Sequence, residues 1–361
     1  FQGIADVGAL LGGGFVVGED DHVQILGPQG EGHLLRRVAA GVGGQFLLID
    51  QVEPGDDLTD EAAGLTADIT LAVDQQFIQE IAQLRNIALE KDVMPEDYTA
   101  RRTAILFNNE NSWNIDQQKQ NNTWNTLGHV EKYYRSLKSF GAPVDFINEK
   151  KDFSEYPVMI VPAYQMADKE LVRKWEKYVK NGGNLVLTCR TAHKDRHGRL
   201  PETPFGAMIY DLTGNEVEFF DTLLPDPPGK VTMDGKEYLW NTWGEILKPV
   251  KETEVWATYT EEFYEGRPAA TTRRLGKGTV TYVGVDSKDG KLEKDILKKL
   301  YARLEIPVMD LPYGVNIEYR NGLGIVMNYT DKPYVFALPE GCKVLIGTLE
   351  IPTAGVLVFK I

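Results

Sequence analysis

The chain has 361 residues, enough for two or three domains, and its 42% hydrophobic and 25% charged residues are typical of an ordinary globular protein. A net charge of −14 argues against a nucleic acid partner, because phosphates require a basic surface. No apolar run approaches the roughly eighteen residues that span a membrane, and residues 1–20 lack the basic start of a signal peptide, so we expect a cytoplasmic protein without a membrane partner.

Cysteine usage narrows the kinds of site that the chain can hold. The sequence contains two cysteines, Cys189 and Cys342, both in apolar segments typical of strands. Two are too few for a disulfide framework or a four-cysteine zinc site. We therefore expect two buried free thiols, as in a reducing compartment, and we predict neither a metal ion nor a cofactor.

Residues 1–85 differ in composition from the rest of the chain. They contain no Lys, Ser, Asn, Tyr, Trp, Met or Cys and are rich in Gly and Ala, although Lys and Ser are common in globular proteins. Three interpretations stay open: a separate domain of biased composition, a flexible Gly-rich part of a larger domain, or a stretch whose recorded residue types are not those of the natural protein. Strand-like segments occur nonetheless, at residues 14–19, 22–26 and 44–51.

A helix is predicted over residues 71–91, where apolar side chains recur at helical spacing: Phe77, Ile81, Leu84 and Ala88. Pro95 ends the helical pattern, and the polar segment 93–102 connects it to the next part of the chain. We place a domain boundary here, so that residues 1–93 form one unit.

Residues 101–195 carry the strongest pattern in the sequence, short apolar runs that alternate with helical segments. Strands are predicted at 103–113, 142–147, 156–164 and 184–191, and helices at 122–141 and 167–183. This alternation predicts crossover units and a parallel sheet. The second helix has one apolar stripe, formed by Leu171, Val172, Trp175, Tyr178 and Val179. The predicted fold class is therefore α/β, with an open parallel sheet in a domain that spans residues 94–305.

The rest of the chain is rich in hairpin signals. Asp234-Gly235 predicts a hairpin over residues 231–241. Further elements are then predicted in chain order, with strands at 254–259, 269–275 and 279–285 and a helix at 291–305. Residues 306–361 are typical of a small antiparallel β domain, with a hairpin about Asn321-Gly322 and short strands at 334–338, 343–347 and 355–361.

Two features near the end of the fourth predicted strand of the α/β domain could carry chemistry. Cys189 lies there, but a nucleophile on a tight strand-to-helix turn needs flanking glycines, and its neighbours are Leu187, Thr188, Arg190 and Thr191. We therefore predict a structural cysteine. His193 and His197 are four residues apart, as metal ligands on one helix face can be. A glycine and a proline close by argue against a helix, so we expect surface loop histidines.

Carboxylates beside asparagines are a second candidate, because a retaining glycosidase needs two carboxyl groups about 5 Å apart. Three such pairs occur: Asn109-Glu110, Asn148-Glu149 and Asn215-Glu216. Glu110 ends a predicted strand, but that strand belongs to an open sheet rather than to a barrel. We expect all three pairs to be structural or solvent-facing.

Two further patterns have simple structural interpretations. Gly276-Lys277-Gly278 is too short for a phosphate-binding loop and predicts a turn. The tryptophans are expected in the core or in interfaces, at positions 113, 124, 175, 240, 243 and 256. Residues 101–361 alone do not supply a complete active site.

One continuous part of the chain resembles a known family. It includes MPEDYTARRTAILFNNENSW (94–113), YPVMIVPAYQMADKELVRKWEKYVKNGGNLVLTCRTAHKDRHGRLPE (156–202) and RRLGKGTVTYVGVDSKDGKLEKDIL (273–297), and residues 94–361 look like the back half of the glycoside hydrolase family 42 β-galactosidases. In that family a catalytic (β/α)₈ barrel precedes a trimerisation domain and a small β domain. The resemblance implies that the trimerisation domain has a class I amidotransferase-like (flavodoxin-like) fold without its nucleophile.

The resemblance extends in outline to residues 1–93. Residues 15–51 have the length and strand placing of the last two barrel strands, and residues 77–85 match the closing helix, which implies a partial (β/α)₈-barrel segment. Glu19 then falls where the family keeps its catalytic nucleophile. The acid/base residue would lie on an earlier strand that this sequence does not contain. A complete barrel needs about 200 residues or more, so these residues cannot close one.

Three functional hypotheses follow. The resemblance implies part of a retaining β-galactosidase that hydrolyses terminal β-D-galactosides, with Glu19 as candidate nucleophile and a homotrimeric assembly. The alternative is a non-catalytic oligomerisation module without a complete active site. A hydrolase or amidotransferase that uses Cys189 is disfavoured by the missing glycines around that residue.

Overall fold

The computed structural model describes residues 14–17, 23–26, 32–35, 93–224 and 226–361, and it divides the chain into two units, residues 1–87 and 88–361. In the first unit, β1 (Gly14–Val17), β2 (Val23–Leu26) and β3 (Gly32–Leu35) pair antiparallel in that order. Barrel strands are parallel instead. Glu19, the strand predicted at 44–51 and the helix predicted at 71–91 lie outside the described residues, so the partial barrel stays a prediction.

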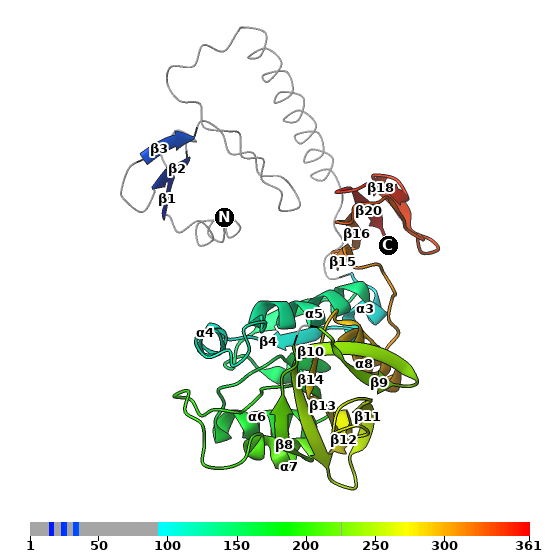
Figure 1. The fold of residues 1–361 in the computed structure, drawn as a ribbon. Coiled ribbons are helices and arrows are strands. Elements are labelled where there is room, and N and C mark those ends of the chain that lie inside the picture. Colours follow the sequence, from blue (N-terminus) through cyan, green and yellow to red (C-terminus); the bar gives the residue numbers. More distant parts are fainter. Residues whose placement is uncertain (1–13, 18–22, 27–31, 36–92, 225) are drawn as a thin grey trace. The chain divides into compact units, whose positions relative to one another are not determined.

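The second unit is built on one 11-stranded sheet. Its first part consists of parallel strands, which in chain order are β4 (Thr103–Leu106), β5 (Val144–Ile147), β6 (Val158–Val161), β7 (Asn184–Thr188) and β13 (Gly278–Val283). Their order in the sheet is β5-β4-β6-β7-β13, and Figure 1 labels β4 and β13 of this set. This order, with the first strand between the second and the third, is that of flavodoxin-like doubly wound sheets.

The remaining strands make the sheet mixed, so the prediction of an open parallel sheet is wrong for this part. They are β8 (Asn215–Asp221), β9 (Gly229–Met233), β10 (Lys236–Pro249), β11 (Glu254–Tyr259), β12 (Pro268–Leu275) and β14 (Val285–Ser287). Each pairs antiparallel with its neighbours. The physical reason is the short connections: Asp234 and Gly235, both with positive φ, turn β9 directly into β10, and such a tight turn joins only antiparallel strands.

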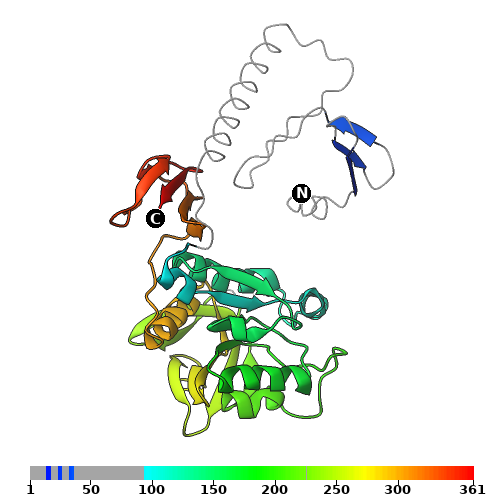
Figure 2. The ribbon, with the colours of Figure 1, turned by 180° about the vertical axis from the view of Figure 1, so that it is seen from behind.

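Helices cover both faces of the parallel strands. The longer ones are α5 (Thr126–Ser139), α6 (Lys169–Lys180) and α8 (Lys291–Arg303), and α8 is orange and α6 green in Figure 2. Alternate strand residues face the two layers: Ile105 and Ile160 share a core with α5 and α8, whereas Leu106 and Val161 share a core with α6. This two-residue period explains why the strands are apolar throughout. No helix among the described residues is long and apolar enough to span a membrane.

The sequence of α6 accounts for its limits and for its buried face. The carboxylate of Asp168 accepts a hydrogen bond of 2.8 Å from the backbone N–H of Leu171 and caps the helix. Trp175 and Val179 are fully buried, as the predicted stripe requires. The helix ends at Lys180, two residues before Gly182, whose φ of +119° suits glycine.

The turn after β4 differs from the prediction. The strand predicted over 103–113 ends at Leu106, and α4 (Asn109–Gln117) begins three residues later. Asn108 causes the change, because its side chain accepts a hydrogen bond of 2.7 Å from the backbone N–H of Glu110 and caps the helix. Glu110 therefore lies in the first turn of a helix rather than at a strand end. Two other short helices are α3 (Glu96–Ala100) and α7 (Tyr210–Thr213).

The C-terminal part is a small antiparallel β structure, as predicted. The main sheet has the order β15 (Val315–Arg320), β16 (Leu323–Asn328), β20 (Val356–Lys360), β18 (Lys343–Ile346). A two-stranded ribbon, β17 (Tyr334–Val335) with β19 (Glu350–Ile351), completes it. Asn321 and Gly322 form the first hairpin, both with positive φ.

Candidate functional site

A hydrogen-bonded relay lies at the carboxyl ends of the parallel strands, where open α/β sheets bind ligands. The imidazole of His129 on α5 joins two partners: its Nε2 lies 2.8 Å from the hydroxyl oxygen of Thr188 at the end of β7, and its Nδ1 lies 2.7 Å from Oδ1 of Asp286 on β14. The ammonium of Lys132 donates to the same carboxylate oxygen at 2.7 Å. The order of hydroxyl, imidazole and carboxylate is that of a hydrolytic triad.

This relay is closed to a substrate. Thr188 is 0% and His129 1% exposed. The hydroxyl oxygen of Thr188 already accepts the backbone N–H of Ala163 at 2.7 Å. Burial alone would raise the pKa of Asp286, but the hydrogen bonds and charges of His129 and Lys132 outweigh burial and lower that pKa. The relay therefore ties α5, β7 and β14 together instead of activating a nucleophile.

A second buried cluster surrounds Glu245 on β10. Its carboxylate, 0% exposed, accepts hydrogen bonds from the backbone N–H of Arg190 at 2.7 Å, the indole of Trp243 at 3.1 Å and the hydroxyl of Tyr282 at 2.6 Å. Nε2 of His193 lies 3.2 Å away, close enough for an ion pair although not aligned as a hydrogen bond. Burial raises the pKa of Glu245, but His193 and these donors outweigh it, so the carboxylate stays charged.

The prediction of surface histidines is wrong for His193, which is 2% exposed. Its loop folds back against β10 because the buried charge of Glu245 needs a partner. His197, further along the loop, is exposed as predicted. The sequence signal that could have indicated this burial is the run of polar residues that follows β7 directly.

Cys189 is a structural residue, as predicted. It is fully buried, and burial together with the negative charges of Glu245 and Asp286 raises the pKa of its thiol well above the usual value. A reactive thiol needs the opposite environment, with access and a lowered pKa. The prediction of two buried thiols holds only for Cys189, because Cys342 is partly exposed.

Backbone strain marks residues that the sequence did not single out. Ala163 after β6, Arg190 after β7 and Ala192 have φ values of +43°, +68° and +58°, which side chains other than glycine adopt rarely. Arg190 is held between two indole rings, its guanidinium carbon 4.5 Å from the centre of Trp124 and 4.4 Å from that of Trp243. Burial lowers the pKa of Arg190 to about 10. These residues form a rigid support for the strand ends.

The three Asn-Glu pairs are structural or solvent-facing, as predicted. Glu110 is exposed. Glu149 binds the guanidinium of Arg196 and accepts the hydroxyl of Tyr164. Glu216 faces Lys248 at 3.3 Å. The tryptophans are buried except Trp113, which is 62% exposed. In the part of the chain that the structure describes, no three side chains of His, Cys, Asp or Glu are grouped to hold a metal ion.

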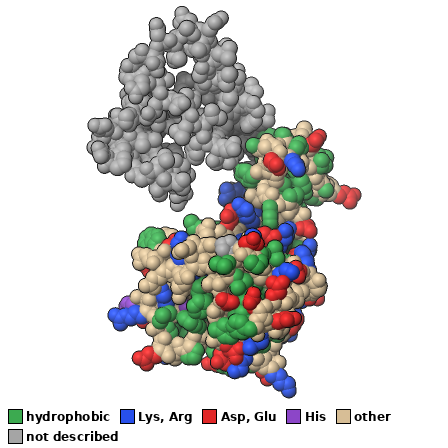
Figure 3. Space-filling view, viewed as in Figure 1, with side chains coloured by type: hydrophobic (Ala, Val, Ile, Leu, Met, Phe, Trp, Pro, Cys, Tyr) green, Lys and Arg blue, Asp and Glu red, His purple; other side chains and the backbone are tan. Residues whose placement is uncertain are grey.

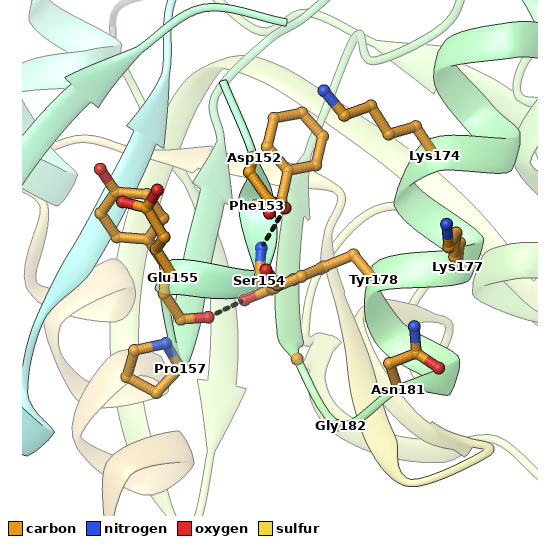
Figure 4. Close-up of a pocket in the computed structure, with 12 residues that line it drawn as sticks. Asp152, Phe153, Ser154, Glu155, Pro157, Lys174, Lys177, Tyr178, Asn181 and Gly182 are labelled. Atoms are coloured by element: carbon orange, nitrogen blue, oxygen red, sulfur yellow. Dashed lines mark hydrogen bonds between the residues drawn. The ribbon is translucent and has the colours of Figure 1, made fainter. Parts of the chain in front are cut away.

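A hollow of about 490 Å³ lies at the amino ends of β6 and β7, and we call it the aromatic hollow. In Figure 4, Lys174, Lys177 and Tyr178 from α6 face the segment 152–157. The hydroxyl of Tyr178 donates to the backbone carbonyl of Tyr156 at 3.0 Å, which fixes the floor. Its lining holds neither a histidine nor a strongly buried acid, so it is suited to binding rather than to acid–base chemistry.

A second hollow, of about 390 Å³, lies beside the N-terminal ends of α5 and α8 and reaches His129 and Asp286. Its cationic and anionic side chains are equal in number, with Lys132, Arg135 and Lys288 opposite Glu131, Asp286 and Asp289. All three anions already bind cations, Asp286 with Lys132, Glu131 with Arg135 and Asp289 with Lys291. No group in this hollow is left poised for a reaction.

Two family models match the chain. The β-galactosidase trimerisation domain matches residues 101–312, and the β-galactosidase C-terminal domain matches residues 314–360. Among curated proteins, the chain is similar to β-galactosidase BgaB of Geobacillus sp. (strain Y412MC61), with 27% identity over 271 residues, 73% of this chain and 40% of the relative. It is 31% identical to β-galactosidase LacA of Lactobacillus acidophilus over 206 residues, 56% of this chain and 30% of the relative. The chain thus spans less than half the length of these relatives.

The chain is also similar to solved structures of β-galactosidases. Gan42B, a GH42 β-galactosidase, is 25% identical with a TM-score of 0.65, over 72% of this chain and 40% of that one. A β-galactosidase from the haloarchaeon Halorubrum lacusprofundi has a TM-score of 0.69 at 24% identity, over 77% and 41% of the two chains, and this likeness concerns the fold alone.

Proposed function

Because the chain belongs to the glycoside hydrolase family 42 β-galactosidases, through their trimerisation and C-terminal domains, we propose that it is part of a retaining β-galactosidase that hydrolyses terminal β-D-galactosides. In this proposal residues 93–361 assemble the enzyme as a homotrimer and do not carry the chemistry. The match of the trimerisation model to residues 101–312 carries the proposal.

The buried acids of the described residues support the proposal that residues 93–361 serve assembly and not catalysis. Retaining hydrolysis needs one free carboxylate and one free carboxylic acid about 5 Å apart. Glu245 and Asp286 are occupied by the partners given above, and Glu293 accepts the backbone N–H of Ser287 at 2.9 Å. Each is therefore engaged in holding the fold. The nucleophile would be Glu19, and the acid/base would lie on an earlier barrel strand.

A second part of the proposal concerns the fold of the α/β domain, residues 94–305. We propose a class I amidotransferase-like domain that has lost its nucleophile, which the flavodoxin-like order of the parallel strands supports. In α/β-hydrolases the nucleophile stands on a strained strand-to-helix turn. Here Ala163, with φ of +43°, occupies the turn from β6 to α6 and offers only a methyl group.

Hydrolysis of a chromogenic β-D-galactoside tests the catalytic part of the proposal. In an enzyme that also includes the earlier barrel strands, we expect turnover that falls by about a thousandfold or more in Glu19→Gln, because removing a nucleophile removes the covalent step. Glu110→Gln, an exposed glutamate on α4, is the matched control and should leave turnover unchanged. Activity that survives Glu19→Gln would remove Glu19 from the site.

The alternative, a non-catalytic oligomerisation module, is favoured because the buried acids Glu245, Asp286 and Glu293 are all engaged in holding the fold. It predicts a trimer without turnover. The hydrolysis assay separates the two, because both require the mass of three chains in light scattering and only the first requires turnover.

A further inference from the structure

Two surfaces of the α/β domain differ in form, since one is an exposed aromatic side chain and the other is a hollow. The first, which we call the acidic turn, is residues 260–266 between β11 and β12, with Phe263 at its tip. The second is the aromatic hollow beside α6. We propose that Phe263 of one copy inserts into the aromatic hollow of the next, and that this contact closes the trimer. This inference rests on the proposed trimeric assembly and adds the surfaces that form it.

Phe263 is an exposed aromatic anchor. It is 82% exposed, the largest fraction among the large hydrophobic side chains of the described residues. Its ring stacks on Phe219 of β8, with centroids 5.5 Å apart and planes 17° from parallel. In Figure 3, hydrophobic and acidic side chains both reach the surface over β8 and β10. Exposed rings of this kind are the usual energetic centres of protein interfaces.

The acidic turn presents this ring rigidly. Tyr264, the next residue, is buried, and its hydroxyl donates to the carboxylate of Asp221 at 2.8 Å. The backbone N–H of Gly266 donates to the carbonyl of Tyr259 at 2.8 Å and closes the turn. Glu262 takes a left-handed backbone with φ of +68°. An anchor that is already ordered loses little conformational entropy on binding, which favours association.

The aromatic hollow can accept such a ring. Its floor is formed by aromatic side chains, of which Phe153 and Tyr178 are buried at 2% and 6% exposure. Its volume of about 490 Å³ exceeds the roughly 150 Å³ in which a benzene molecule fits. The ammonium of Lys174 lies 4.0 Å from the centre of the Phe153 ring and closes one side. The hollow is therefore a preformed aromatic socket.

The acidic turn and helix α6 carry opposite net charges, while the lining of the hollow itself balances Lys174 and Lys177 with Asp152 and Glu155. Residues 260–266 contain three glutamates and no cation, and Glu262 and Glu265 are exposed. Helix α6 carries five cations and two anions in its 12 residues, KELVRKWEKYVK. Lys177, which lines the hollow, is exposed and makes no ion pair within residues 93–224 and 226–361. The glutamates that flank Phe263 would therefore meet Lys177 at the rim of the socket.

Symmetry makes this pairing suitable for a ring. The two surfaces come from different parts of the chain, so the contact is heterologous. Each copy contributes Phe263 to one neighbour and its aromatic hollow to the other. Contacts of this type close into rings when the rotation permits, and three copies form the smallest ring beyond a dimer. A twofold dimer would instead bring identical surfaces together.

Light scattering on the full chain tests the contact. We expect Phe263→Asp to weaken trimer formation by at least about thirtyfold in concentration, because it removes an interface anchor and adds a charge. Val335→Asp is the matched control, since Val335 is 68% exposed on the small β domain and should leave the mass unchanged. Circular dichroism should show both variants folded, since the replaced side chains are mostly exposed.

A charge exchange makes the pairing specific. Glu265→Lys and Lys177→Glu should each weaken the trimer by several fold, and the two changes together should restore it to within about threefold of the wild type. A trimer unaffected by Phe263→Asp, or a double variant weaker than both single variants, would overturn the contact but leave the trimer itself standing. A monomeric wild type would instead overturn the assembly proposal and with it the contact.

Discussion

The carboxylate of Glu245 on β10 and the imidazole of His193 after β7 form a buried pair, with 3.2 Å between Oε1 and Nε2. Two segments that are 52 positions apart in the sequence are thereby joined at the carboxyl end of the sheet. A buried carboxylate that accepts three hydrogen bonds and faces an imidazole holds geometry strongly, but it is not free to exchange a proton with a substrate. The same pair therefore explains both the rigidity of this end and its lack of chemistry.

Glu245→Gln should destabilise the protein substantially. The amide keeps the volume of the side chain but removes the charge that faces His193, and breaking a buried pair costs roughly 3 kcal/mol. The free energy of unfolding from urea titration should fall by about that amount. Glu216→Gln, which removes a surface pair on β8, should cost less than about 1 kcal/mol. Equal effects of the two variants would contradict the description of Glu245 as a buried, paired charge.

Lowering the pH should remove the stability that the carboxylates of Glu245 and Asp286 contribute to the fold. The pKa of Glu245 and that of Asp286 are both lowered in the folded protein. A lowered pKa contributes stability that is present above the unfolded value, about 4 for both groups, and is lost as the pH falls through the folded value. The cost of Glu245→Gln should therefore shrink as the pH falls below about 4. A cost that is constant from pH 7 to pH 3 would show that the carboxylate is not charged in the fold.

The two thiols should differ in reactivity. Cys189 is fully buried and its thiol pKa is raised, whereas Cys342 is partly exposed. A thiol reagent should modify Cys342 in the native protein and both cysteines only after denaturation. Native Cys342→Ser should then show no modification, measured by intact mass. Rapid labelling of Cys189 in the native protein would contradict its structural role.

Asn108→Ala should destabilise α4 by about 1 kcal/mol, because it removes the side-chain cap on the N–H of Glu110. Gln117→Ala, at the exposed last position of the helix, should change the unfolding free energy by less than about 0.5 kcal/mol. Urea titration measures both. The comparison checks that the chain turns from strand to helix at this asparagine.

Much of the fold could be predicted from the sequence, because its signals are local. The apolar runs of β4, β6 and β7 and the stripe of α6 reflect burial on both faces of a sheet and on one face of a helix. Asp234-Gly235 and Asn321-Gly322 predict their hairpins because these residues adopt positive φ readily.

The prediction missed features that depend on contacts distant in the sequence. Pairing between β10 and β8 or β14 joins segments whose own sequences say nothing about direction, so the mixed character of the sheet was not visible. His193 is buried only because Glu245 lies on the strand beneath it. Phe263 and the aromatic hollow have ordinary sequences, and only exposure and shape in the folded chain single them out.

The most direct test of the account is the mass of the full chain in solution, measured by sedimentation equilibrium over a range of concentrations. The account predicts three times the chain mass of 40.5 kDa, with dissociation promoted by Phe263→Asp. A mass of one chain at every concentration would contradict the role in assembly that we propose for residues 93–361.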